Sequence, residues 1–97
     1  MTNPSTTYRL TQRAERDLKD IYRYTLKAFG AAQAEKYLLE LDSVFGLLAR
    51  HPAMGRLYDG QTHQFVHGKH IILYRTASDA IVIGRIFHGA QQAPGTR

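Results

Sequence analysis

The feature that most constrains this fold is a change of hydrophobic period between residues 48 and 64. Over residues 14–48 the apolar side chains recur every three or four positions, the spacing that places them on one side of an α-helix. From residue 64 onward they occur instead in short runs rich in β-branched and aromatic residues, which is typical of strands. The pattern predicts two helices followed by a small sheet, with each layer covering the other.

The first helix is expected to begin after Thr11, whose hydroxyl can accept a hydrogen bond from a free N–H of the first turn. Gly30 is expected to end it, because glycine readily adopts the left-handed conformation found at helix ends. The apolar side of this helix consists of Ala14, Leu18, Ile21, Thr25, Ala28 and Phe29.

A second helix is expected to end before Pro52, and the short link between the two helices predicts an antiparallel hairpin. Its apolar side consists of Ala34, Tyr37, Leu38, Leu41, Val44, Phe45 and Leu48. The segment "PAMGRLYDGQTH" that follows has no sustained period and is predicted to be a loop.

Three strands are predicted from "QFVHG", "KHIILYR" and "AIVIGRIFH", separated by Gly68 and by the polar turn "TASD". Together they form an antiparallel meander, and the early segment "TYRL" is also compatible with a strand. The predicted class is therefore α+β, a two-layer β-α-α-β-β-β fold with an N-terminal helix hairpin packed on an antiparallel sheet.

Length and composition predict one domain over residues 1–97, with loose tails at 1–6 and 92–97. The sequence has no cysteine, so neither disulfides nor thiolate metal ligands can support the fold. It carries no apolar run of the roughly 20 residues needed to span a bilayer, nor a basic and apolar leader. A cytoplasmic protein without a membrane partner is expected.

The formal charge of +5 favours an anionic partner, and residues 50–97 hold most of the excess, with six basic and two acidic side chains. The first helix is nearly balanced, because its basic residues alternate with acidic ones at spacings that allow pairs such as Arg16 with Asp20. This balance favours a solvated helix surface and argues against a simple DNA-binding module.

Arg85 and His88 stand out because they interrupt and end the last, mostly apolar strand. Arg85 can be structural, with its guanidinium bonded to a carboxylate or to carbonyl groups at the sheet edge. It can also form a basic surface together with Arg75 on the adjoining strand. His88 can be a hydrogen-bonding residue at the end of the strand or a proton donor.

Three further histidines, His63, His67 and His70, lie close together in the sequence. Their positions place His70 on the opposite side of a strand from the other two, and no acidic cluster completes a ligand set. We therefore predict neither a metal site nor another cofactor.

Four stretches, taken in order, carry a family resemblance. They are "YRLTQRAERDLKDIYRYT", "AEKYLLELDSVFGLLARHPAMGR", "GKHIILYR" and "IVIGRIFHGAQ". Over about residues 7–91 the chain resembles the ParE branch of the ParE/RelE toxin superfamily. The resemblance implies a toxin that binds and inhibits DNA gyrase, and a cognate ParD-like antitoxin whose acidic, helical C-terminal segment neutralises it. Operator DNA would then be contacted only indirectly, through the antitoxin.

The resemblance also implies an alternative, because RelE-type relatives share the fold and cleave mRNA at the ribosome. A ribonuclease needs groups that activate the 2′-hydroxyl and offset phosphate charge, and Arg56, Arg75, Arg85 and His88 form the candidate set. We favour binding without catalysis. The predicted contact residues for antitoxin or target are Arg56, Leu57, Tyr74, Arg75, Arg85, Phe87 and His88.

Overall fold

The computed structural model describes residues 7–90, so the predicted tails at 1–6 and 92–97 lie outside the described residues. The order of the two helices and the three long strands along the chain is as predicted. The elements are β1 (Tyr8–Leu10), α1 (Gln12–Phe29), α2 (Ala31–Arg50), a 3-10 turn (Pro52–Met54), β2 (Arg56–Leu57), β3 (His63–His67), β4 (His70–Thr76) and β5 (Ile81–His88). Within residues 7–90 no helix is long and apolar enough to cross a membrane.

The five strands form one sheet in the order β1-β5-β4-β3-β2. β3, β4 and β5 are antiparallel, which confirms the meander. The sheet as a whole is mixed, however, because β1 lies parallel to β5 with Tyr8 opposite Ile81. The predicted two-layer α+β fold is confirmed, and its antiparallel sheet is corrected only at β1, which is a parallel edge strand. The connection from β1 to β5 runs through both helices and through β2, β3 and β4, and so long a crossover permits a parallel pair.

One further strand falls where the sequence predicts only a loop. The two residues Arg56 and Leu57 form β2, which pairs antiparallel with β3 at the outer edge of the sheet. Both side chains are exposed, so β2 adds no apolar residue to the core and leaves no periodic signal in the sequence. Within the predicted loop, Pro52–Met54 form the 3-10 turn before β2, and residues 58–62 connect β2 to β3.

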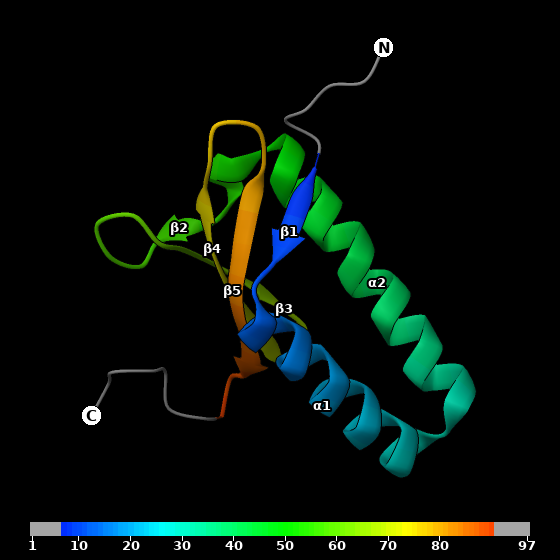
Figure 1. Ribbon diagram of the computed structural model, residues 1–97. Coiled ribbons are helices and arrows are strands. Elements are labelled where there is room, and N and C mark those ends of the chain that lie inside the picture. Colours follow the sequence, from blue (N-terminus) through cyan, green and yellow to red (C-terminus); the bar gives the residue numbers. More distant parts are fainter. Residues whose placement is uncertain (1–6, 91–97) are drawn as a thin grey trace.

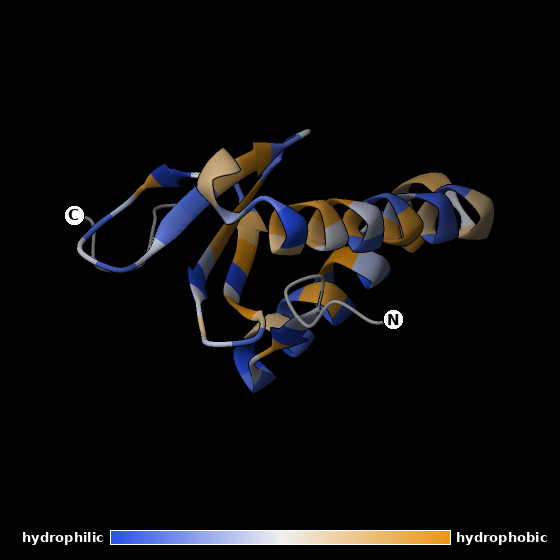
Figure 2. Ribbon diagram, turned by 90° about the horizontal axis from the view of Figure 1, so that it is seen from above, coloured by the Kyte–Doolittle hydropathy of each residue, from blue (hydrophilic) through white to orange (hydrophobic). Residues whose placement is uncertain are grey.

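The helix hairpin covers one face of the sheet, and the connection between the helices lies at the end farthest from the strands (Figure 1). Gly30 makes this connection with a φ of 96°, as its predicted role requires. Ala28 and Phe29 are exposed because the tip of the hairpin extends past the sheet. In Figure 2 hydrophobic residues lie where helices and strands meet, and hydrophilic residues dominate the loop before β3.

The core lies between the helices and the central strands. α2 contributes the larger apolar side chains from the helical layer, and Phe45, 1% exposed, packs edge-on against the Tyr8 ring at 5.2 Å. The principal members of the core are Ala14, Ile21, Leu41, Phe45, Leu48, Ile72, Tyr74, Ile81, Ile83 and Ile86. The predicted apolar sides of both helices therefore face the sheet, except for the last turn of α1.

Tyr74 fixes the segment that leads from α2 into the sheet. Its buried hydroxyl donates to the carbonyl of Pro52 at 2.7 Å and accepts the N–H of Gly55 at 2.9 Å. A Cβ at position 55 would lie 2.3 Å from that hydroxyl, so only glycine fits there. Burial raises the pKa of Tyr74, and the Gly55 hydrogen bond partly offsets that rise.

Candidate functional site

The predicted residue Arg85 lies at an edge of β5 that β1 does not cover. β1 pairs with β5 only as far as Ile83, whereas β5 continues to His88. Beyond that point the carboxylate of Asp17, on α1, accepts the N–H of Ile86 and the Nε–H of Arg85, each at 2.8 Å. The ion pair is largely shielded, with side-chain exposures of 24% for Arg85 and 10% for Asp17. The Asp17 carboxylate thus accepts a backbone N–H of β5 that a carbonyl of a neighbouring strand would otherwise accept.

A β-bulge precedes this ion pair. The strand register passes from Leu73 opposite Arg85 to Tyr74 opposite Ile83, so that Gly84 is the extra residue. The Thr11 hydroxyl donates to the Gly84 carbonyl at 3.0 Å and also accepts the N–H of Ala14, which caps α1 as predicted. Thr11 therefore ties the start of α1 to the bulge, and the bulge positions Arg85 next to Asp17.

A groove of about 790 Å³ runs between α1 and the ends of β4 and β5. We call it the strand-end groove. Its cationic and aromatic walls come from α1 and from two strands, and two carboxylates also line it. The side chains concerned are Arg13, Arg16, Asp17, Asp20, Ile21 and Tyr24 from α1, and His70, Arg85, Ile86, Phe87 and His88 from the strands.

His70 joins this groove to α2. Its Nδ1 lies 2.7 Å from the hydroxyl of Tyr37, and its ring meets the His88 ring edge-on at 5.6 Å. His67 stacks on Tyr37, and its Nε2 lies 3.6 Å from a carboxylate oxygen of Glu40. Burial, followed by the nearby His88 and His67, lowers the pKa of His70. Burial and the Glu40 charge raise the pKa of Tyr37.

The three histidines at positions 63, 67 and 70 are divided between two places. His63 stacks on Tyr74, away from the pair formed by His67 and His70 at the β3–β4 turn. Among residues 7–90 no three His, Asp or Glu side chains are grouped so that they could hold a metal ion.

The other predicted contact residues are spread across the sheet. Arg56 and Leu57 lie on β2, and Arg56 is separated from Arg85 by β3 and β4. With about 4.8 Å between neighbouring strands, their backbones lie roughly 14 Å apart. Arg75 is exposed and shares a smaller hollow of about 230 Å³ with Arg85. Arg85 therefore belongs to two concavities, whereas Arg56 belongs to neither.

Two of the predicted contact residues are buried. Tyr74 is 1% exposed and Phe87 is 4% exposed, so the rings belong mainly to the interior. The guanidinium of Arg85 lies 5.6 Å from the centre of the Phe87 ring, which allows a cation–π contact. Phe87 can thus support the position of Arg85 while contributing little surface of its own.

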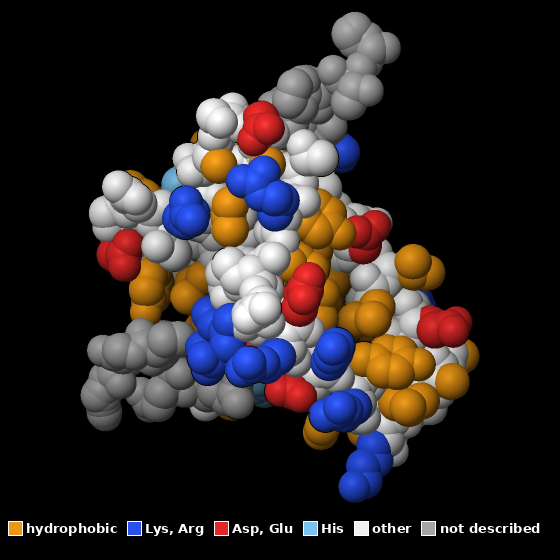
Figure 3. All heavy atoms as spheres, viewed as in Figure 1, with side chains coloured by type: hydrophobic (Ala, Val, Ile, Leu, Met, Phe, Trp, Pro, Cys, Tyr) orange, Lys and Arg blue, Asp and Glu red, His pale blue; other side chains and the backbone are white. Residues whose placement is uncertain are grey.

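A second groove, of about 370 Å³, lies between the two helices on the other side of α1. We call it the interhelical groove and define it by Leu18, Lys19, Tyr22, Arg23 and Leu38. In Figure 3 a hydrophobic patch lies between α1 and α2, and Lys and Arg side chains gather along α1 beside it. This groove combines an apolar floor with a basic rim, the arrangement that receives an amphipathic helix.

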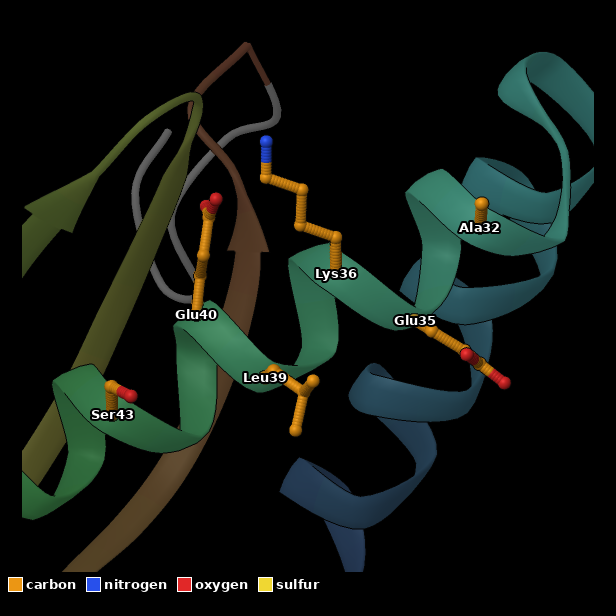
Figure 4. Close-up of a pocket in the computed structure, with 6 residues that line it drawn as sticks. All are labelled: Ala32, Glu35, Lys36, Leu39, Glu40 and Ser43. Atoms are coloured by element: carbon orange, nitrogen blue, oxygen red, sulfur yellow. The ribbon is translucent and has the colours of Figure 1, made fainter.

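The outer side of α2 has a shallow hollow that comes from this helix alone (Figure 4). In that view Lys36 and Glu40 point to one side, whereas Leu39 and Glu35 point toward α1. Leu39 is 69% exposed. Because no second element faces this hollow, it brings no convergent groups together for binding or catalysis. Leu39 instead extends the apolar surface beside the interhelical groove.

Asp17 is a neighbour of Arg85 that was not predicted. Charge alternation along the first helix places Asp17 on the solvated surface, but Asp17 falls between Ala14 and Ile21 at the spacing of the buried side. A carboxylate at a buried helical position and an arginine in an apolar strand are each costly alone. Their joint presence was a usable signal, although it did not specify the pairing.

This architecture is that of toxins from bacterial toxin–antitoxin pairs. Among solved structures it resembles the chromosomal ParDE system of P. aeruginosa, with a TM-score of 0.74, 18% identity and coverage of 88% of this chain and 97% of that one. It also resembles the RelBE2 toxin–antitoxin complex of Mycobacterium tuberculosis, with a TM-score of 0.60, 27% identity and coverage of 84% and 95%.

Sequence comparison identifies the family within this class. The family model described as the ParE toxin of the type II toxin–antitoxin system parDE matches residues 8–93. Toxin ParE1 of Caulobacter vibrioides is 33% identical over 89 residues, which cover 89% of this chain and 92% of the relative. Toxin ParE1 of Mycobacterium tuberculosis is 32% identical, with coverage of 87% and 90%. The chain belongs to the ParE toxin family.

Proposed function

We propose that this ParE-family toxin inhibits DNA gyrase by binding, without catalysis, and that a cognate ParD-like antitoxin neutralises it. The observation that carries the proposal is the family match over residues 8–93. Gyrase as the target, and the cytoplasm as the place of action, follow from what the family resemblance implies.

The arrangement of basic residues supports binding over RNA cleavage. A ribonuclease site requires its acid, base and phosphate-binding groups to converge on one phosphodiester. Here Arg56 lies on the outermost strand, and Arg85 is paired with Asp17. Arg75 and His88 line different concavities. The four residues of the candidate catalytic set therefore do not share one site.

The interhelical groove is the proposed seat of the antitoxin's acidic helical segment. Leu18, Tyr22 and Leu38 would receive its apolar side chains, and Lys19 and Arg23 would face its carboxylates. The exposed Leu39 and Phe29 widen the apolar surface available to such a helix. Burial of this patch, together with the charge match at its rim, would give a stable complex.

A supercoiling assay with purified gyrase tests the proposal. The chain should block supercoiling in a concentration-dependent manner, and added antitoxin should restore it. RNA in translating ribosomes should remain intact at the same toxin concentration. Normal supercoiling together with specific mRNA cleavage would replace this function with the ribonuclease alternative.

A matched pair of variants tests the antitoxin seat. Tyr22→Ala alters the interhelical groove, whereas Tyr24→Ala removes a similar side chain from the other side of the same helix. Antitoxin affinity, measured by calorimetry, should fall for Tyr22→Ala and stay near the parental value for Tyr24→Ala. Equal losses would place the antitoxin elsewhere.

A further inference from the structure

The strand-end groove has a cationic surface that the charge balance of α1 conceals in the sequence. Asp17 is turned inward to Arg85 and Ile86, so its charge is already compensated within the fold. Asp20 lies 3.8 Å from Arg23 in an exposed pair. No carboxylate of residues 7–90 lies within 4.0 Å of Arg13 or Arg16. These two arginines therefore provide positive charge that the fold itself does not neutralise.

An exposed aromatic side chain lines the same groove, about two turns further along α1. Tyr24 is 67% exposed and lines the same groove as Arg13 and Arg16. The three residues recur along α1 at intervals of three and eight, which brings them to one side of the helix. Across the groove, the imidazoles of His70 and His88 add polar ring nitrogens. Arginines and an exposed aromatic ring along one groove are the combination that binds backbone phosphates while a base stacks on the ring.

We propose that the strand-end groove binds a segment of single-stranded nucleic acid. Arg13 and Arg16 contact consecutive backbone phosphates, and Tyr24 stacks on a base. Recognition is independent of sequence, since stacking and phosphate contacts are available from every nucleotide. The inference goes beyond the proposed function, because it assigns to the toxin itself a nucleic-acid contact separate from the antitoxin's groove.

An acidic peptide is the competing occupant, and the stacking platform argues against it. A carboxylate-rich segment would use the arginines, but it would gain little from an exposed tyrosine beside them. The interhelical groove on the other side of α1 is also better suited to a peptide, because its floor is apolar. The two sides of α1 thus offer different chemistry to different partners.

Fluorescence anisotropy with a labelled oligo-dT of about ten nucleotides tests the proposal. The Arg13→Ala/Arg16→Ala variant should bind about tenfold or more weakly, and its salt dependence should be shallower by about one to one and a half in the log–log slope. Tyr24→Ala should also weaken binding about tenfold but leave that slope unchanged. An oligo-U arm distinguishes RNA from DNA as the preferred strand.

The matched control is Lys19→Ala/Lys36→Ala, which removes the same charge from surfaces outside the strand-end groove. It should retain near-parental affinity. The proposal is overturned if this control loses as much affinity as the Arg13/Arg16 variant, or if no binding occurs at 50 mM salt. It is also overturned if polyglutamate of equal charge competes as well as unlabelled oligo-dT.

This assay contains neither gyrase nor antitoxin, so its outcome is independent of the proposed function. Oligonucleotide binding without gyrase inhibition would support the assignment of the strand-end groove and contradict gyrase as the target. Gyrase inhibition without oligonucleotide binding would do the reverse. Since Arg13, Arg16 and Tyr24 are exposed, the variants should fold, and matching urea midpoints would establish this.

Discussion

The two helices of the hairpin support the fold in different ways. α2 buries only apolar side chains, namely Ala34, Leu41, Phe45, Leu48 and Ala49. α1 buries two polar residues, Asp17 and Thr25, beside Ala14 and Ile21. The hydroxyl of Thr25 bonds within its own helix, to the carbonyl of Ile21 at 2.7 Å, whereas Asp17 bonds to β5.

The two helices therefore contribute differently: α2 mainly stabilises the fold, and α1 is held in a defined position relative to β5. Apolar packing by α2 is non-directional and supplies most of the helical layer's share of the core. The directed hydrogen bonds of α1 fix the position of a charged helix relative to the end of β5. Because both grooves lie on α1, we expect changes in α2 to affect stability most, and changes in α1 to affect geometry and binding as well.

The largest effect is expected from Phe45→Ala on α2. Removal of this buried ring should lower the free energy of unfolding by about 3–5 kcal/mol, through lost burial and the cavity that remains. Urea denaturation measures the loss. Leu39→Ala, on the exposed side of the same helix, should stay within about 0.5 kcal/mol of the parent. A comparable loss from Leu39→Ala would contradict the assignment of the core.

Asp17→Ala on α1 should rank second. It leaves the shielded Arg85 guanidinium and the Ile86 N–H without their partner, and we expect a loss of about 3 kcal/mol in the same urea experiment. Asp20→Ala, one turn further along, is the control and should change stability by less than about 0.5 kcal/mol. If Asp17→Ala were as mild as this control, α1 would not be anchored to the sheet through Asp17.

Thr11→Val should have a moderate effect, because it keeps the shape but removes both the helix cap and the hydrogen bond to the Gly84 carbonyl. We expect a loss of about 1–2 kcal/mol. Thr11→Ser, which retains the hydroxyl, should recover most of it. A Thr11→Val chain as stable as the parent would contradict the role assigned to the hydroxyl.

The smallest effect concerns pH and the half-buried His70. Its lowered pKa means that the folded chain binds a proton less readily than the unfolded chain. The stability that its neutral ring contributes is therefore present above the ordinary value of 6.5 and decreases as the pH falls below it. The urea midpoint should drop less between pH 7.5 and 5.5 for His70→Gln than for the parent.

His51→Gln is the control for this pH experiment, since His51 is exposed at the end of α2. Because His67 and His88 lie next to His70, the double variant His67→Gln/His88→Gln would show whether the neighbours share the effect. An unchanged profile in His70→Gln would contradict its assigned role.

The hydrophobic period predicts the helices and the three long strands, because each buries an apolar side that the sequence displays directly. It does not predict the place of β1 beside β5. A three-residue strand contributes too few side chains to specify its neighbour, and its parallel pairing depends on the path of the whole chain between β1 and β5. β2 was missed for a similar reason, since both of its residues are exposed.

The candidate site was only partly predictable. From the sequence, Arg85 is a candidate for pairing with a carboxylate, and the structure confirms such a pair. The partner Asp17 could not be identified, because helical spacing offers several acidic residues and cannot rank contacts across 68 positions. The cationic groove was missed altogether, since counting charges along α1 gives near balance regardless of which carboxylates are turned inward.

The carboxylate at the edge of β5 also affects how copies of the toxin behave when crowded together. Exposed ladder groups on a strand can template the addition of foreign strands, which is a common origin of aggregation. Beyond Ile83 that risk is reduced, because the Asp17 carboxylate accepts the Ile86 N–H and the Thr11 hydroxyl donates to the Gly84 carbonyl. An added strand would have to displace an anchored helix first, so this stretch is guarded against fibre-like growth.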